Sequence, residues 1–193
     1  MTEIKVLIEG YANEIKGGWK ASSSVVFVRN KKKNILIDTG CNRKKLLDSL
    51  RKEKLNTGDI DFVILTHNHL DHILFAGIFE NAKVLTTEEM YKNDKQVVHN
   101  NIISGTDLKI IQTPGHCNEH CSVVIPIGKK VYVFAGDVFW WIDGKKQSLD
   151  INKIDDAHID EVNVKKLVQS RKKLLEIADY IIPGHGKMFK VKK

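Results

Sequence analysis

The chain has 193 residues, of which 42% are hydrophobic and 28% are charged. This composition is typical of a globular protein with a buried core. No segment approaches the roughly 20 apolar residues needed to cross a bilayer, and the N-terminus lacks a secretory signal pattern. Three cysteines without a CxxC pair do not indicate a disulfide framework. We therefore expect one domain over residues 1–193, in the cytoplasm and without a membrane partner.

The formal net charge is +7. Basic residues are concentrated in four segments, residues 29–33, 43–54, 165–173 and 187–193. Such a charge would attract an anionic substrate, RNA included. The alternative is a lysine-rich surface that is simply solvated, as in proteins adapted to heat. Charge alone does not decide between these interpretations.

The N-terminal half reads mainly as strands. Strands are predicted over residues 4–9, 24–29, 35–38 and 62–65, and helices over residues 42–54 and 72–79. Leu46, Leu47 and Leu50 share one face of the first helix. Residues 62–65 are continuously apolar, as expected of a strand that is buried on both faces.

The C-terminal half continues the mixture of strands and helices. Strands are predicted over residues 83–86, 108–113, 122–127, 131–135 and 180–182, and one long helix over residues 162–178. That helix carries lysines opposite its apolar face. Strands interleaved with amphipathic helices indicate an α/β architecture in which helices cover sheets. The periodicity does not reveal how the sheets are arranged.

The segment Thr66-His67-Asn68-His69-Leu70-Asp71-His72 directly follows the buried strand. In an extended loop His67 and His69 project to the same side, so both rings can bind one metal ion. Asp71 and His72 lie where the chain turns into a helix and can face a second metal. The alternative makes Asp71 a helix N-cap and the histidines part of a polar turn.

Three more polar residues follow apolar strands. His116 lies in a Thr-Pro-Gly-His segment, Asp137 in Ala-Gly-Asp and His185 in Pro-Gly-His-Gly. Each follows a predicted strand and has a glycine beside it, which lets the backbone approach a neighbour closely. Together with the histidine-rich loop, these residues predict a metal site at the ends of the strands.

The chain resembles the metallo-β-lactamase superfamily over its full length. The matching pieces, in the family's order, are Ile37-Asp38-Thr39-Gly40, the loop from His67 to His72, His116, Asp137 and His185. The resemblance implies an αβ/βα four-layer sandwich with the metals at one edge.

The resemblance also implies the ligands of two divalent ions. It assigns His67, His69 and His116 to the first ion, Asp71, His72 and His185 to the second, and Asp137 to a bridge between them. Asp38 and Thr66 would lie behind the ligands and hold them. Nitrogen and carboxylate ligands favour Zn²⁺, while iron and manganese stay open.

Hydrolysis by a metal-activated hydroxide follows from such a site, with Asp71 orienting the nucleophile or accepting its proton. A closer likeness is to a subfamily associated with endoribonuclease activity. It is carried by residues 9–12, 136–139, 170–173 and 178–186. The resemblance therefore implies a phosphodiesterase acting on an anionic substrate such as RNA.

Other functions stay open at this point. A thioester hydrolase of the glyoxalase II type is the main alternative, with a small ester or thioester as substrate. Against it, only eight residues follow His185, which leaves no room for a glutathione-binding helical domain. An iron-dependent sulfur dioxygenase of the same superfamily is a third candidate, and one iron per chain would favour it.

Two further features have more than one interpretation. Trp140 and Trp141 closely follow Asp137 and are predicted either to line the mouth of the site, where they could stack on a base or an acyl group, or to pack in a core or a homodimer contact. The cluster His116-Cys117-x-x-His120-Cys121 could be taken for a separate zinc site, but the family pattern requires only His116 from it.

Overall fold

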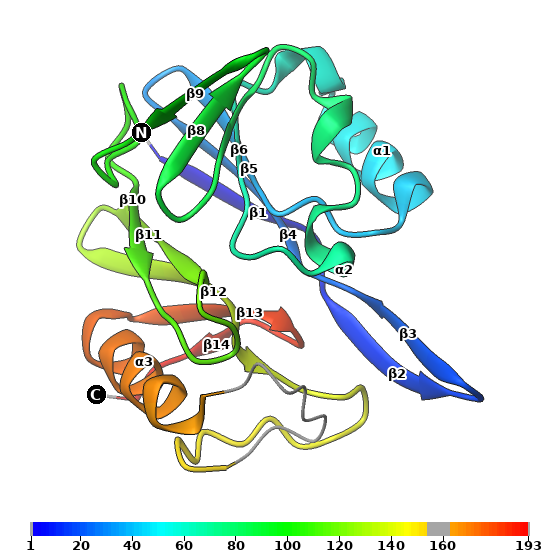
Figure 1. Ribbon diagram of the computed structural model, residues 1–193, viewed down its shortest axis with the longest axis vertical. Coiled ribbons are helices and arrows are strands. Elements are labelled where there is room, and N and C mark those ends of the chain that lie inside the picture. The colour runs from blue at the N-terminus through cyan, green and yellow to red at the C-terminus, as the bar shows by residue number, and fades with distance from the viewer. Residues whose placement is uncertain (1, 154–162, 193) are drawn as a thin grey trace.

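Two β-sheets lie face to face in the computed structural model, which describes residues 2–153 and 163–192 (Figure 1). In this part of the chain the first sheet comprises, in spatial order, β1 (Glu3–Ile8), β4 (Val25–Asn30), β5 (Lys33–Ile37), β6 (Phe62–Ile64), β7 (Lys83–Leu85), β8 (Glu89–Lys92) and β9 (Lys95–Val98). The second comprises β10 (Lys109–Gln112), β11 (Cys121–Ile127), β12 (Lys130–Trp140), β13 (Tyr180–His185) and β14 (Phe189–Lys190). A separate hairpin, β2 (Tyr11–Ile15) and β3 (Gly18–Ser22), projects from the body of the molecule.

Alternating side chains explain the face-to-face packing of the sheets. In β4, Val26 and Val28 point into the core between the two sheets, whereas Val25 and Phe27 point to the outer face of their sheet. All four residues are buried, because a strand with both faces covered exposes neither set of side chains. The apolar runs of the sequence therefore fill two layers of core at once.

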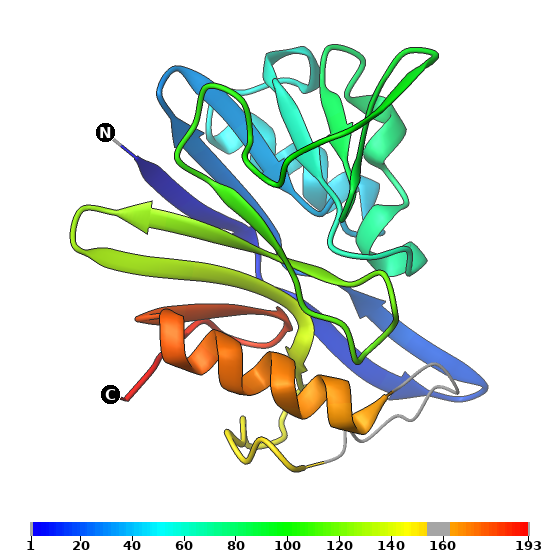
Figure 2. The same cartoon turned by 60° about the vertical axis from the view of Figure 1, so that its left-hand side comes forward.

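Helices cover the outer faces of both sheets. Helix α1 (Arg43–Lys52) lies on the outer face of the first sheet and α3 (Val164–Ile177) on that of the second (Figure 2). Leu46 and Leu50 are buried beneath α1, and Leu167 and Leu174 are buried beneath α3. The predicted four-layer αβ/βα sandwich is thereby confirmed. Among the described residues, no helix combines the length and apolar character that a membrane span requires.

The helix predicted over residues 72–79 differs from the one observed. The structure has a single turn, α2 (Leu70–Ile73), followed by a separate 3₁₀ turn at Ala76–Ile78. The reason lies in the carbonyl oxygen of His72, which accepts the backbone N–H groups of Thr39 and Gly40, at 2.7 and 3.0 Å. These bonds take the place of the next helical bond, so the helix ends within one turn of the histidine-rich loop.

Two hairpins were not predicted from the sequence. The β2–β3 hairpin lies where no strand was expected, and the β8–β9 hairpin extends the edge of the first sheet. Their strands are largely exposed, so they lack the apolar alternation that indicates a strand. A Gly17-Gly18 pair and an Asn93-Asp94 pair mark the two turns, and Gly17 and Asn93 adopt positive φ angles of 81° and 54°.

The packing of α1 can be tested at Leu46, whose side chain is fully buried. We expect Leu46→Ala to lower the free energy of unfolding by about 2–5 kcal/mol, because it removes buried methyl groups and leaves a cavity. Urea unfolding followed by circular dichroism measures this loss. Lys44→Ala, on the exposed face of the same helix, is the control and should change stability little. Equal effects of the two substitutions would contradict this packing.

Candidate metal centre

Seven polar side chains converge at one end of the sandwich, where strands of both sheets end. They form two groups, His67, His69, His116 and Asp137 in the first and Asp71, His72 and His185 in the second. Within each group the potential ligand atoms lie within 4.8 Å of one another. The structure thus brings together all seven residues that the sequence singled out, from segments more than 100 residues apart.

The three histidines of the first group point their ring nitrogens at one another. His69 Nδ1 lies 3.0 Å from His67 Nε2 and also 3.0 Å from His116 Nε2. His67 and His69 extend from the loop that follows β6, and His116 comes from the loop that follows β10. A neutral imidazole carries one N–H and one lone pair, so three such nitrogens facing one point are suited to a shared cation.

A buried carboxylate holds the histidine-rich loop from behind. Asp38 follows β5, and its Oδ1 accepts the backbone N–H of Thr66 at 2.8 Å. Its Oδ2 accepts the hydroxyl of Thr66 at 2.9 Å and lies 2.7 Å from His72 Nδ1. Because a carboxylate accepts, His72 Nδ1 carries a proton, and Nε2 is the nitrogen that faces the second group.

Two more histidine rings of the site are held in the same manner. His185 Nδ1 donates to the carbonyl oxygen of Tyr11 at 3.0 Å, and His67 Nδ1 lies 3.0 Å from the hydroxyl of Thr66. Each tie engages the ring nitrogen that points away from the site. The ties orient the rings and direct Nε2 inward, as is usual for histidines that bind metals.

Asp137 lies between the two groups. Its carboxylate oxygens are 3.3 Å from His72 Nε2, 3.4 Å from His116 Nε2 and 3.6 Å from His185 Nε2. Its close approach to β13 depends on Gly184, because a Cβ atom there would lie 1.8 Å from Asp137 Oδ1.

The prediction that Asp137 ends a strand was wrong. β12 continues to Trp140, and its register with β13 shifts on both sides of Gly136, which has a φ of 53°. The resulting bulge turns Asp137 into the site without ending the strand.

Burial and charge act differently on the two groups. Burial lowers the pKa of His67 well below its ordinary value and that of His116 to about 4, so both rings are neutral and keep a lone pair. Burial also disfavours the charged form of His185, but the carboxylates of Asp137 and Asp71 outweigh it and raise its pKa to about 9. The carboxylates therefore stabilise positive charge at the second group, whether a proton or a metal cation carries it.

The fit of this site to metal cations rests on polar atoms without partners. His72 Nε2 and Asp137 Oδ1 are buried, and neither has a hydrogen-bond partner among the described residues. Burying such atoms without a partner is costly. Cations held by the two groups would satisfy both atoms, so the residues present fit a pair of divalent ions.

An apolar pocket of about 450 Å³ gives access to the site. Five of the seven polar residues line it, together with Trp19 and Leu70, and its lining includes neither lysine nor arginine. Trp140 also lines this pocket, in an edge-to-face contact with Trp19 at 6.4 Å between ring centroids. Trp19, on the hairpin that was not predicted, is a wall residue that sequence reasoning missed.

Trp141 does not share the position of its neighbour. Its side chain is buried and packs against Phe139 and Phe189 in the core beneath α3. Successive residues of a strand point to opposite faces, so only one of two adjacent tryptophans can face the pocket. Of the two interpretations left open for Trp141, packing in a core is therefore the one that the structure supports.

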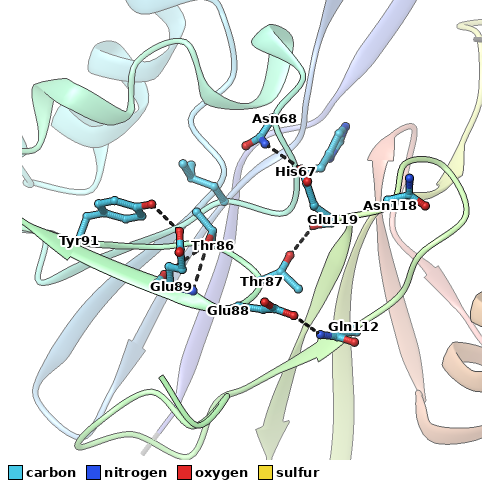
Figure 3. A pocket seen from close by; sticks show the side chains of 11 residues that line it. His67, Asn68, Thr86, Thr87, Glu88, Glu89, Tyr91, Gln112, Asn118 and Glu119 are labelled. Carbon is cyan, nitrogen blue, oxygen red and sulfur yellow. Dashed lines mark hydrogen bonds between the residues drawn. The ribbon is translucent and has the colours of Figure 1, made fainter. Parts of the chain in front are cut away.

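A second, polar pocket of about 530 Å³ lies on another side of His67 (Figure 3). Its carboxylates are held by neighbouring donors, with Gln112 donating to Glu88 at 2.9 Å and Asn68 donating to Glu119 at 3.3 Å. Of the seven converging residues, only His67 lines this pocket. The apolar pocket, which five of the seven residues line, is thus the main opening onto the two groups.

Metal-dependent hydrolysis is the chemistry that this fold and site define, and the chain belongs to the metallo-β-lactamase superfamily. The family model described as "Metallo-beta-lactamase superfamily" matches residues 18–94. Metallo-beta-lactamase domain-containing protein 1 of Xenopus laevis is 30% identical over 98% of this chain and 82% of its own length. The human protein of the same name is 32% identical, and the chain spans 59% of its length.

Further relatives support a metallo-hydrolase. A probable metallo-hydrolase of Methanocaldococcus jannaschii is 30% identical over 82% of this chain and 74% of its own length. The crystal structure of a putative metallo-beta-lactamase from Thermotoga maritima superposes with a TM-score of 0.71 and 21% identity, covering 98% of this chain and 99% of its own. This chain thus shares the fold of the Thermotoga maritima protein along nearly its whole length.

The hold of Asp38 on the site can be tested by metal binding. We expect Asp38→Asn to weaken Zn²⁺ binding about 10- to 100-fold, because the amide offers one acceptor oxygen in place of two. Titration calorimetry with the metal-free protein measures the dissociation constant. Asp48→Asn, on the outer surface of α1, is the control for loss of a negative charge. An unchanged dissociation constant in Asp38→Asn would refute this role for Asp38.

Proposed function

We propose that this metallo-hydrolase cleaves phosphodiester bonds in single-stranded nucleic acid, with RNA as the first substrate to test. The observation that carries the proposal is the pair Trp19 and Trp140 on the wall of the pocket that contains His116 and His185. Unpaired bases stack on exposed aromatic rings regardless of sequence. Stacking of this kind would hold a flexible strand with one phosphate against the site.

Positive charge near the pocket supports the same proposal. Helix α3 begins beside the loop that carries His116, since the backbone N–H of Asn163 donates to the carbonyl oxygen of Gly115 at 2.6 Å. Lys165 and Lys166, in the first turn of α3, are exposed. With a net charge of +7, the chain would attract a polyanion and offer lysines for phosphates that flank the scissile one.

Divalent ions bound here would lower the pKa of a bound water and stabilise charge on the phosphate. The nitrogen and carboxylate ligands favour zinc over iron or manganese. The residues then have distinct roles. Asp71 faces the pocket, with its carboxylate 3.2 Å from His185 Nε2, and is placed to orient the attacking water and accept its proton. Asp137 holds the two groups at a fixed separation, and Asp38 keeps His72 in the required tautomer.

A second candidate is hydrolysis of a small ester or thioester. It is favoured by the apolar wall of the pocket, which includes Ala12, Ala21 and Leu70 and to which no lysine or arginine contributes. An acyl group would bury apolar surface against this wall without any cationic partner. Phosphodiester and thioester substrates thus depend on different parts of the same site.

The choice between substrates can be made directly. We expect zinc- or manganese-loaded protein to cleave labelled single-stranded RNA and to leave S-lactoylglutathione intact. Asp71→Ala is the blank, and its RNA cleavage should fall by at least about 100-fold, the usual size of a lost general base. Gel electrophoresis of the RNA and absorbance of the thioester measure the two reactions. Thioester turnover without RNA cleavage would reject the nuclease and establish the second candidate.

Stacking makes a separate prediction at Trp19. We expect Trp19→Ala to raise KM for single-stranded RNA about 5- to 150-fold, because loss of one stacked base costs about 1–3 kcal/mol. The value of kcat should change little, since Trp19 is not among the residues of the two groups. Trp19→Phe, which keeps an aromatic face, should recover most of the affinity. A KM in Trp19→Ala equal to that of the wild type would exclude stacking on this residue.

A further inference from the structure

The backbone of Asp137 needs an acceptor that the sheet does not provide. Asp137 has no partner in the described register of β11 or β13, because the bulge at Gly136 interrupts the pairing. Its N–H is buried, and a buried N–H without an acceptor is costly. The acceptor is a side chain, since Asp137 N donates to His120 Nε2 at 3.1 Å.

His120 is itself held by a chain of buried hydroxyls. His120 Nδ1 lies 3.0 Å from the hydroxyl of Thr113, which lies 2.8 Å from the hydroxyl of Ser122. Ser122 donates to the carbonyl oxygen of Ala135 at 3.1 Å. The side chains of His120, Thr113 and Ser122 are fully buried. This series of hydrogen bonds thus begins at Asp137 of β12 and returns to β12 two residues earlier, at Ala135.

The two backbone groups at the ends of this series determine which atom donates and which accepts in every hydrogen bond between them. The carbonyl of Ala135 can only accept, so Ser122 donates to it and accepts from Thr113. Thr113 has then used its only hydrogen and must accept from His120 Nδ1–H. At the other end the N–H of Asp137 can only donate, so Nε2 of His120 must carry the lone pair. Both ends require the same neutral tautomer.

We propose that His120 is a positioning residue that fixes the backbone of Asp137 and thereby the carboxylate that joins the two metal groups. The proposal rests on the metal site of the proposed function and not on its substrate. His120 is not a ligand, because its Nε2 accepts from Asp137 and its Nδ1 donates to Thr113. Its ring nevertheless lies against the first group, with its centroid 4.9 Å from that of His67.

Packing leaves Asp137 little freedom apart from this bond. A Cβ atom at Gly136 would lie 2.6 Å from His120 Nε2, so the imidazole fills the space that the glycine leaves open. If the ring loses its acceptor, the buried N–H of Asp137 must turn toward another partner. The carboxylate would move with it, since both belong to the same residue. Metal affinity should therefore report on a residue that never contacts the metal.

The experiment measures Zn²⁺ binding to four variants by titration calorimetry against a competing chelator. His120→Leu removes the acceptor and should weaken binding about 10- to 100-fold, the usual effect of losing a partner of a metal ligand. His120→Gln places an amide oxygen where Nε2 was and should stay within about threefold of the wild type. Thr113→Val removes the acceptor of Nδ1–H and should weaken binding, whereas Thr113→Ser should not.

A spectroscopic measurement separates positioning from a merely structural role. The visible absorption of Co²⁺-loaded protein depends on the ligand geometry, so it should change in His120→Leu and Thr113→Val but not in His120→Gln or Thr113→Ser. Circular dichroism of the metal-free proteins reports whether each variant folds. If His120→Leu does not fold, Thr113→Val against Thr113→Ser decides the question in its place.

The possible results divide cleanly. A wild type that binds two equivalents of Zn²⁺, with His120→Leu or Thr113→Val binding as tightly and giving the same Co²⁺ spectrum, would overturn this inference and leave the proposed function standing. A wild type that does not bind two equivalents would overturn both. Loss of affinity in the leucine and valine variants, with recovery in the glutamine and serine variants, supports the inference.

Discussion

The arrangement of the site depends on one buried carboxylate. Asp38 is fully buried, and its φ of 53° places it in the left-handed region, where residues other than glycine are rarely found. Its N–H donates to the carbonyl of Ile64, and its two oxygens bond Thr66 and His72. A buried anion is stable only when such partners surround it. The hydrogen bonds of Asp38 therefore fix the end of β5, the loop after β6 and the first turn of α2 relative to one another.

Charge is distributed unevenly over this molecule. The chain as a whole is basic, yet Asp38, Asp71 and Asp137 gather beside the histidines, and the pocket above them is lined by neither lysine nor arginine. Carboxylates at the base of the pocket attract cations, whereas lysines on the outside attract anions. Attraction of cations and attraction of anions do not compete, because the carboxylates lie at the base of the pocket and the lysines lie on the surface.

Sequence reasoning predicted the seven converging residues because their residue types themselves indicate metal binding. Four of the seven residues stand out because they fall within six positions of one loop, and the other three because each lies beside a glycine after an apolar run. Neither pattern needs knowledge of distant contacts. The role of His120 was not recognised, because its partners Thr113 and Ser122 are ordinary residues whose meaning appears only after β10, β11 and β12 pair. The choice between pocket and core for Trp140 and Trp141 could not be made, because the length of β12 beyond Gly136 could not be predicted.

The same distinction holds for the fold. Strands that are buried on both faces, such as β4 and β6, were predicted from their apolar runs, since burial leaves a clear signal in composition. The β2–β3 and β8–β9 hairpins are exposed and were missed. The end of α2 was misjudged because a bond from Thr39, more than 30 residues away in sequence, ends it.

Each of the two metal groups draws on both sheets. In the first group His67 and His69 follow β6 of the first sheet, whereas His116 follows β10 and Asp137 lies in β12 of the second sheet. In the other group His185 of β13 comes from across the interface to meet Asp71 and His72. A cation bound to either group is therefore a cross-link between the two halves of the sandwich. Unfolding either half would release it, so the free energy of metal binding adds to the cohesion of the sheets. Metal binding and the association of the two sheets are therefore thermodynamically linked.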